Sequence, residues 1–207
     1  MKDDVSELST IERDALAEIG NMGVARAATS LRQLLGEQIL LSVPAVRIVS
    51  RETAARLVEK GNSTKLVAVQ QGFEGPFSGR ALLIFPEAQS LELVRAVVGE
   101  EHSLEDVIAL EQEALAETGN IILNACLATI ANVLRQTMRM SLPSVVRGSG
   151  ATLFGAGGES GNMVLFLYID FTIKRRDLHG FIALLMDLPS IAALKAIVND
   201  FIGRVEQ

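Results

Sequence analysis

The chain carries the same seven-residue pattern twice, as ALAEIGN at residues 15–21 and as ALAETGN at residues 114–120. Six of the seven letters are identical, and the two copies lie 99 residues apart. A second pair of matching segments, SVPAV at 42–46 and SLPSV at 141–145, is separated by the same 99 residues. Two matches in one register indicate an internal duplication rather than chance, so the two halves should fold alike around an approximate twofold axis.

The two halves predict a similar order of elements, which is a long helix, a strand, a hairpin of two further strands and a closing helix. Apolar, β-branched runs bounded by turn residues mark the strands. The predicted helices cover about 10–35, 51–59, 87–98, 105–136 and 189–203, and the predicted strands about 38–49, 65–72, 78–85, 139–147, 162–172 and 178–186. We expect the glycine-rich stretch 148–161 to be a mobile connection, because it matches neither G-x-G-x-x-G nor the P-loop pattern.

Antiparallel strands with helices between them favour an α+β architecture. No Pro- or Ser-rich linker separates the halves, so we expect residues 1–207 to form a single domain with internal repeats at about 9–99 and 108–204. Each half offers about three strands, which is few for a sheet of its own. The predicted fold is therefore a duplicated, pseudo-twofold domain with one sheet of about six strands, two long helices that bear the repeated pattern, and several shorter helices.

Each long helix has one face that carries acidic and amide side chains. With about 100° of rotation per residue, positions i, i+4 and i+7 fall within roughly 60° of one another. The residues at these positions are Asp14, Glu18 and Asn21 in the first copy and Glu113, Glu117 and Asn120 in the second. A solvated helix face would explain one such group. Its presence in both copies favours a functional surface, because an amide beside a carboxylate can hold a water or bind a partner's backbone and lysine.

Glycines and prolines recur with the pattern and point to structural roles. Gly20 and Gly119 lie on the opposite, apolar face of their helices. Glycine inside a helix costs roughly 1 kcal/mol relative to alanine, so we expect both to permit a close approach to a neighbouring helix or sheet. Pro44 and Pro143 follow the two Asn residues at the same distance and fall in predicted strands. A proline there removes a ladder donor, which predicts an edge strand or a bulge.

Composition excludes several classes of function. The net charge is −6 and aromatic residues make up 4% of the chain, which argues against a nucleic-acid partner. The single cysteine, Cys126, cannot form a disulfide within the chain and suits a reducing compartment. The polar N-terminal segment is unlike a signal peptide, and the apolar run 163–169 is too short to cross a membrane. We therefore expect a cytoplasmic protein without a membrane partner. His102 and His179 lie far from Cys126 in sequence, so no metal site is predicted.

The full spacing of the pattern is an acidic residue, three residues, Glu, two residues, Asn, 22 residues and Pro. This spacing resembles the signature of the CheC family of bacterial chemotaxis phosphatases. The segment EIGNMGVARAATSL, which begins at Glu18, is also similar to that family. The resemblance covers nearly the whole chain, including the duplication. One position departs from it, because the family usually has Asp or Ser where the second copy has Glu113.

The resemblance implies a protein phosphatase that hydrolyses the aspartyl phosphate of phosphorylated CheY, a response regulator. In such an enzyme Glu18 and Glu117 would pair with the active-site lysine of CheY and fix the docking register. Asn21 and Asn120 would orient a water in line with the phosphorus, and Asp14 and Glu113 would be auxiliary partner-binding residues. The resemblance implies no cofactor of the chain's own, because CheY supplies Mg²⁺.

Two other functions stay open at this point. CheC proteins bind CheD, a receptor deamidase, so the chain would act as a non-catalytic adaptor for CheD or for a response regulator. Alternatively, it is a flagellar switch component similar to FliM or FliY. The two intact Glu/Asn pairs favour the enzyme, and we expect it to be a monomer.

Overall fold

One mostly antiparallel sheet organises the computed structural model of the protein, which describes residues 7–35, 39–59, 65–98, 103–155, 163–173 and 176–205. The helices are α1 (Thr10–Leu35), α2 (Arg51–Val58), α3 (Glu87–Val98), α4 (Leu104–Val133), α5 (Gly150–Phe154) and α6 (Leu188–Val205). The strands are β1 (Ile39–Ser50), β2 (Leu66–Glu74), β3 (Gly79–Pro86), β4 (Arg139–Met140), β5 (Ser144–Gly148), β6 (Met163–Ile173) and β7 (Arg176–Met186). The predicted α+β class and the order of the long elements are confirmed.

Two predictions in the second half are wrong in detail. The strand expected at 139–147 is divided into β4 and β5, because the chain leaves the ladder around Pro143, which has no N–H to donate. The stretch expected to be a loop from residue 148 begins with the short helix α5, whose N-cap Ser149 accepts a hydrogen bond from the Thr152 N–H. The rest of that glycine-rich stretch, residues 156–161, lies outside the described residues.

The strands of the two halves are interleaved in the sheet. Their order is β1-β6-β7-β3-β2-β4, and β5 also pairs with β2. The first strand of each half therefore pairs with the hairpin of the other half, β1 with β6 and β5 with β2. Where β3 meets β7 at the centre, Leu83 faces Ile182, and these residues are 99 positions apart, as are the repeated patterns. The pseudo-twofold axis thus passes between β3 and β7.

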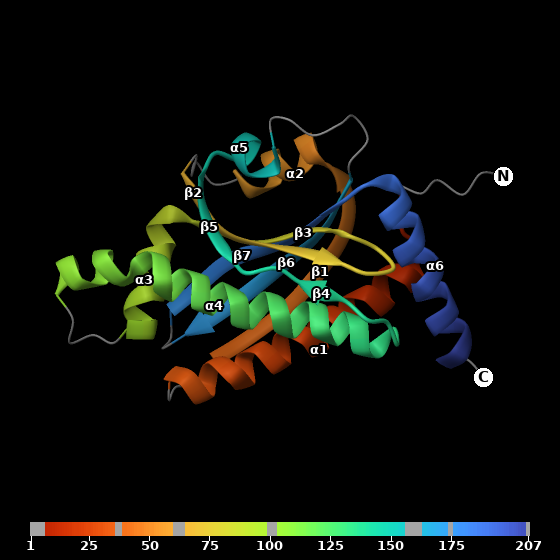
Figure 1. The fold of residues 1–207 in the computed structure, drawn as a ribbon, viewed down its shortest axis with the longest axis horizontal. Coiled ribbons are helices and arrows are strands. Elements are labelled where there is room, and N and C mark those ends of the chain that lie inside the picture. Colours follow the sequence, from red (N-terminus) through yellow and green to blue (C-terminus); the bar gives the residue numbers. More distant parts are fainter. Residues whose placement is uncertain are drawn as a thin grey trace.

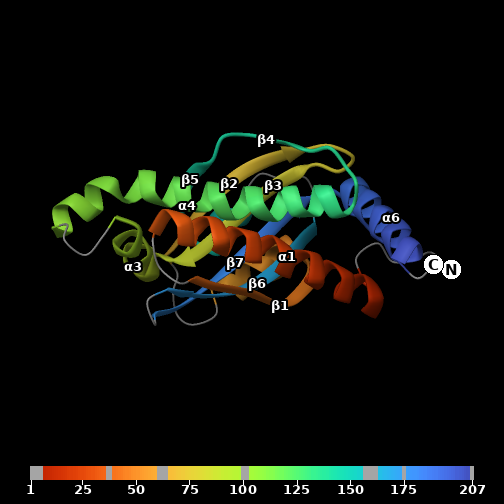
Figure 2. The ribbon, with the colours of Figure 1, turned by 90° about the horizontal axis from the view of Figure 1, so that it is seen from below.

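Helices cover both faces of the sheet (Figure 1). The helices α1, α3 and α4 lie on one face, and α2 and α5 lie on the other. Seen from below, α1 and α4 run side by side in opposite directions, with α6 at one end (Figure 2). Successive strand residues alternate between the two layers: in β2, Val67 and Val69 join the core under α1 and α4, while Leu66 and Ala68 join the core under α2 and α5. This period of two is the pattern of a sheet covered on both faces.

The helix α4 is a core helix. The stretch Glu105–Val133 is long and apolar enough to cross a membrane. However, 61% of its most apolar 18-residue segment is buried inside the fold. Its Cys126 lies against α1, where a Cβ added to Gly23 would come within 2.9 Å of the Cys126 Cα atom. Burial raises the pKa of the Cys126 thiol to about 12, so this thiol is not poised for chemistry.

The two glycines of the repeated pattern let the long helices contact the sheet. A Cβ added to Gly119 would overlap the Cβ atom of Val69 in β2. A Cβ added to Gly20 would meet the Leu167 Cδ2 atom in β6 at 3.2 Å. Val69 and Leu167 occupy equivalent positions in the two halves. Their pairing partners, Val145 for Val69 and Val46 for Leu167, are 99 residues apart, as are the repeated patterns. The same close helix–sheet contact therefore occurs in both halves.

We expect Gly119→Ala to lower the free energy of unfolding by about 1–3 kcal/mol, because the clash with a backbone-anchored Cβ outweighs the gain of roughly 1 kcal/mol in helix propensity. The matched control is Gly20→Ala, which meets a terminal methyl that can rotate away and should change stability by less than about 1 kcal/mol. Urea denaturation followed by circular dichroism measures both. Equal losses in the two variants would contradict the packing described above.

Candidate functional site

The acidic and amide residues of the repeated pattern lie on the surfaces of α1 and α4. The carboxylates of Glu18 and Glu117 are exposed, whereas Asn21 and Asn120 are half-buried. The prediction placed Glu and Asn together on an outward face. The structure instead turns each Asn toward the edge of the sheet, where its amide makes hydrogen bonds. A half-buried amide has a fixed direction, which a freely solvated one lacks.

In the first copy, the Asn21 amide is bonded to the backbone of β1. Its Oδ1 accepts a hydrogen bond from the Val43 N–H at 2.8 Å, and its Nδ2 donates to the Val43 carbonyl at 3.4 Å. The β1–β6 register shifts between Ser42 and Ala45, around Pro44. The Asn21 side chain thus takes the place of a neighbouring strand at this irregularity, and both ends of its amide are engaged.

In the second copy, the Asn120 amide is bonded to side chains instead. Its Oδ1 accepts from Asn124 Nδ2 at 2.7 Å and from Gln71 Nε2 at 3.4 Å. Gln71 also donates to the Ser141 carbonyl at 2.7 Å, which ties the group to the segment between β4 and β5. In the part of the chain that the structure describes, the Asn120 Nδ2 group has no hydrogen-bond acceptor. The two copies of the pattern therefore hold their amides differently.

The edge strands beside the two amides also differ. Pro44 lies within β1 at one edge of the sheet, and Pro143 lies in the interruption between β4 and β5 at the other. Val43, which precedes Pro44, is 2% exposed, whereas Leu142, which precedes Pro143, is 90% exposed. The residue before the proline is thus presented to solvent in the second copy but buried in the first.

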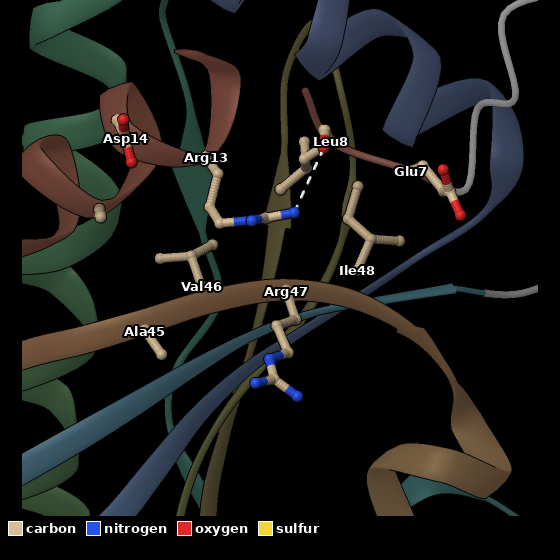
Figure 3. Close-up of a pocket in the computed structure, with 9 residues that line it drawn as sticks. Glu7, Leu8, Arg13, Asp14, Ala45, Val46, Arg47 and Ile48 are labelled. Carbon is tan, nitrogen blue, oxygen red and sulfur yellow. Dashed lines mark hydrogen bonds between the residues drawn. The ribbon is translucent and has the colours of Figure 1, made fainter. Parts of the chain in front are cut away.

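A hollow of about 540 Å³ lies between the first turns of α1 and the strand β1. Its lining residues are Glu7, Leu8, Arg13, Asp14, Ala17, Ala45, Val46, Arg47 and Ile48. Figure 3 shows the guanidinium groups of Arg13 and Arg47 on opposite sides of β1, so the two do not converge on one ligand. Asp14 reaches this hollow, but Glu18 and Asn21 do not line it, and Glu113 is exposed on α4. The Glu/Asn pairs therefore lie on helix surfaces, which suits contact with a macromolecule.

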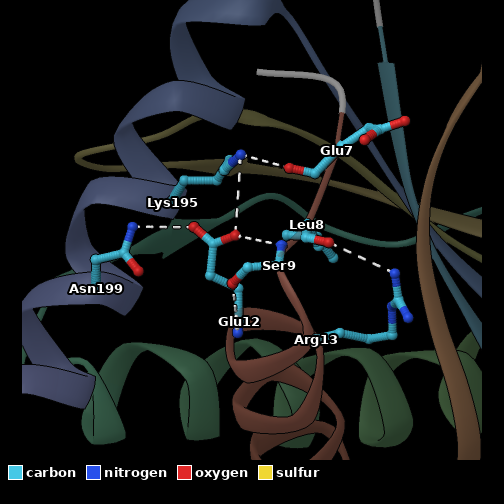
Figure 4. Close-up of polar contacts among 7 residues, drawn as sticks. All are labelled: Glu7, Leu8, Ser9, Glu12, Arg13, Lys195 and Asn199. Atoms are coloured by element: carbon cyan, nitrogen blue, oxygen red, sulfur yellow. Dashed lines mark hydrogen bonds and ion pairs between the residues drawn. The ribbon is translucent and has the colours of Figure 1, made fainter. Parts of the chain in front are cut away.

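The start of α1 is fixed by a polar network with α6 (Figure 4). Ser9 and Glu12 form reciprocal hydrogen bonds, with Ser9 N–H donating to Glu12 Oε2 at 2.7 Å and Glu12 N–H donating to Ser9 Oγ at 3.2 Å. From α6, Asn199 Nδ2 donates to Glu12 Oε1 at 2.9 Å, and Lys195 Nζ lies 3.9 Å from Glu12 Oε2. This network fixes the start of α1 and thereby the position of Asp14, the first acidic residue of the repeated pattern.

The buried Glu12 stays ionised because of these contacts. Burial by itself would raise its pKa, but the hydrogen bonds from Ser9 and Asn199 and the charge of Lys195 outweigh burial and lower the pKa from the ordinary value of 4.5. The Glu12 charge is thus stabilised in the folded protein.

Sequence reasoning missed two residues that contact the second amide, Gln71 and Asn124. Each left a signal that could have been noticed. Gln71 stands in β2 at a helix-facing position, where the alternation of Val67, Val69 and Phe73 calls for an apolar residue. Asn124 follows Asn120 by one helical turn and occupies the place of Ala25 in the first copy.

Comparison with known proteins gives matches in both halves of the chain. The family described as "Chemotaxis phosphatase CheX" matches residues 67–167, and the "CheC-like family" matches residues 11–48. The CheY-P phosphatase CheC of Bacillus subtilis is 27% identical over 157 residues, which cover 74% of this chain and 73% of that protein.

Two FliY proteins are also similar. The flagellar motor switch phosphatase FliY of B. subtilis is 24% identical over 144 residues, which cover 69% of this chain but 37% of FliY. The crystal structure of Thermotoga maritima FliY covers 95% of this chain and 98% of that chain, with a TM-score of 0.74 and 19% identity. This likeness shows that the fold is shared.

We expect stability to depend on the Glu12 charge at acidic pH. Because the folded-state pKa is lowered, the charge stabilises the protein above the ordinary value of 4.5, and this contribution is lost as the pH falls below that value through the folded pKa. Glu12→Gln should therefore be less stable than the wild type at pH 7, with the difference shrinking as the pH falls below 4.5. Hydrogen bonds from Ser190 also lower the pKa of Asp187. Asp187 is present in both the wild type and the variant, so its contribution to the pH dependence cancels in the difference. A difference in urea midpoint that does not change with pH would contradict the network.

Proposed function

Because the chain belongs to the CheC/CheX/FliY family of chemotaxis proteins, we propose that it hydrolyses the aspartyl phosphate of a phosphorylated CheY-type response regulator. The observation that carries the proposal is the exposed Glu beside a hydrogen-bonded Asn, present on both long helices. The name of the B. subtilis relative, a CheY-P phosphatase, supports the choice of substrate.

In the proposed reaction, the partner is recognised by the exposed carboxylates. Glu18 or Glu117 pairs with the lysine beside the aspartyl phosphate and fixes the register of docking. The exposed Leu142 lies next to the second pair and offers an apolar contact to the same partner. Asp14 and Glu113, one helical turn before each Glu, are proposed as auxiliary contacts, and the longer Glu113 reaches further from α4 than Asp14 does from α1.

The Asn amide then positions a water for attack. The water oxygen forms a bond to phosphorus, the bond between phosphorus and the aspartyl oxygen breaks, and its electron pair stays with the aspartate, which leaves inorganic phosphate. Phosphoryl transfer depends on positioning and charge stabilisation, because its transition state is loose. A neutral amide can orient the water without repelling the phosphoryl oxygens, which a second carboxylate would do. We propose that Mg²⁺ is supplied by the response regulator.

A second candidate function is a component of the flagellar switch, and the fold shared with FliY favours it. FliY of B. subtilis is itself named a phosphatase, so the two functions are compatible. An adaptor role toward CheD is a further proposal, and binding of a partner without turnover would support it.

We expect Asn21→Ala combined with Asn120→Ala to reduce turnover of the phosphorylated response regulator on the order of 10²–10³-fold, the usual cost of removing one positioning group in an active site. Phosphate release at steady state measures this, and circular dichroism checks that the fold is retained. Unchanged decay of the phosphorylated response regulator with this variant would contradict the mechanism.

The single variants should differ, because the two amides are held differently. We expect Asn120→Ala to remove most of the turnover and Asn21→Ala to leave most of it, since Asn21 must first release the Val43 backbone before it can bind a water. The same assay measures both. A larger loss with Asn21→Ala would show that the first copy carries the activity.

A further inference from the structure

Two residues outside the repeated pattern hold the Asn120 amide in one orientation. Gln71 and Asn124 both donate hydrogen bonds to its Oδ1 atom, at 3.4 and 2.7 Å. If the amide were turned over, its NH2 group would face two other NH2 groups, which cannot accept a hydrogen bond. The oxygen of Asn120 therefore faces inward and its NH2 group faces away from the two donors.

We infer that Gln71 and Asn124 are positioning residues of the second site, which hold the Asn120 amide with its NH2 group toward the docked partner. The inference rests on the proposed function, because it assigns these residues a part in that reaction. Neither residue contacts the substrate; each acts through Asn120.

The burial of Gln71 supports a role beyond packing. Gln71 is 3% exposed, and its Oε1 atom is buried without a hydrogen-bond partner among the described residues. A buried acceptor without a partner destabilises a protein, and an apolar residue of similar size would avoid this. Polar groups that are unfavourable for folding are found most often at functional sites. The two N–H groups of the Gln71 amide, in contrast, are shared among three acceptors, the Oδ1 atoms of Asn120 and Asn124 and the Ser141 carbonyl.

The first half shows that the fold does not require these residues. Corresponding positions there are occupied by Ala25 in α1 and by Ile169 in β6, which is buried and apolar. Without the two donors, Asn21 is bonded to the Val43 backbone instead. The polar pair thus occurs only beside the amide whose NH2 group is left available in the described structure.

An outward NH2 group suits the proposed chemistry. It donates a hydrogen bond to one lone pair of the attacking water, and the other lone pair remains for phosphorus. It also faces the negatively charged phosphoryl oxygens with a donor rather than an acceptor. Loss of the inward hydrogen bonds would let the amide rotate and spend part of its time with the oxygen facing the phosphoryl group.

The kinetic test uses Asn21→Ala as the background, so that turnover comes from the second copy. Gln71→Met combined with Asn124→Ala is expected to lower kcat on the order of ten- to a hundredfold, because misplacement of a reacting group by a small distance has this effect. KM should change little, since Glu117 and Leu142 still dock the partner. The matched control is Ile169→Met in the same background, which should change neither constant. Urea midpoints of all variants separate loss of positioning from loss of fold.

A second measurement tests the orientation without the reaction. In ¹⁵N-labelled protein, the side-chain NH2 signals of Asn120, identified by their absence in Asn120→Ala, should broaden strongly with a soluble paramagnetic agent. The Gln71 NH2 signals should be protected, and Gln71→Met combined with Asn124→Ala should make those of Asn120 less accessible, because the amide can then rotate.

The outcomes separate the inference from the proposed function. Absence of turnover in the wild-type protein, with the Asn120 NH2 group accessible, would overturn the proposed function and leave the orientation supported. Turnover in the wild type that is lost in the Asn21→Ala protein would overturn the inference, because the second site would then be inactive. Normal turnover with unchanged kcat in the Gln71→Met, Asn124→Ala protein would overturn the inference. Protection of the Asn120 NH2 group from the paramagnetic agent would overturn it as well.

Discussion

The close contact between each long helix and the sheet, at Gly20 on Leu167 and at Gly119 on Val69, is the constraint on which the rest of the structure depends. Helix α1 of the first half contacts β6 of the second half, which pairs with β1. Helix α4 of the second half contacts β2 of the first half, which pairs with β5. Because the strands are interleaved about the Leu83–Ile182 pair, neither half can form its contact alone. The contact brings Asn21 and Asn120 down to the two edges of the sheet, while the preceding Glu residues remain in solvent.

Duplication gave two similar surfaces, but the hydrogen bonds beneath them have diverged. In the first half the edge strand continues through Pro44 with a register shift, and Asn21 completes its backbone bonding. In the second half the edge strand is broken around Pro143, Leu142 turns outward, and side chains from β2 and α4 hold Asn120. The amide of the first copy thus has both of its ends bonded within the fold, whereas the NH2 group of the second has no acceptor among the described residues.

Much of the fold could be predicted from the sequence because its signals are local or repeated. The 99-residue repeat, the helical spacing of the acidic and amide residues and the alternating strands need no knowledge of tertiary contacts. The roles of Gln71 and Asn124 do need it, because they depend on which strand residue lies under which turn of α4. The inward tilt of Asn21 was missed for the same reason: helical periodicity gives the face of a residue but not the position of the sheet edge. The short α5 is held by a cap in a glycine-rich stretch that has no apolar periodicity.

The proposed phosphatase activity requires this surface to hydrolyse an aspartyl phosphate rather than only to bind the protein that carries it. The most direct measurement is phosphate release from a phosphorylated CheY-type response regulator with the wild-type protein present at substoichiometric concentration. We expect each molecule of the protein to release many molecules of phosphate, at a rate proportional to the concentration of the protein. Stoichiometric binding of the response regulator with phosphate release no faster than its spontaneous decay would contradict it.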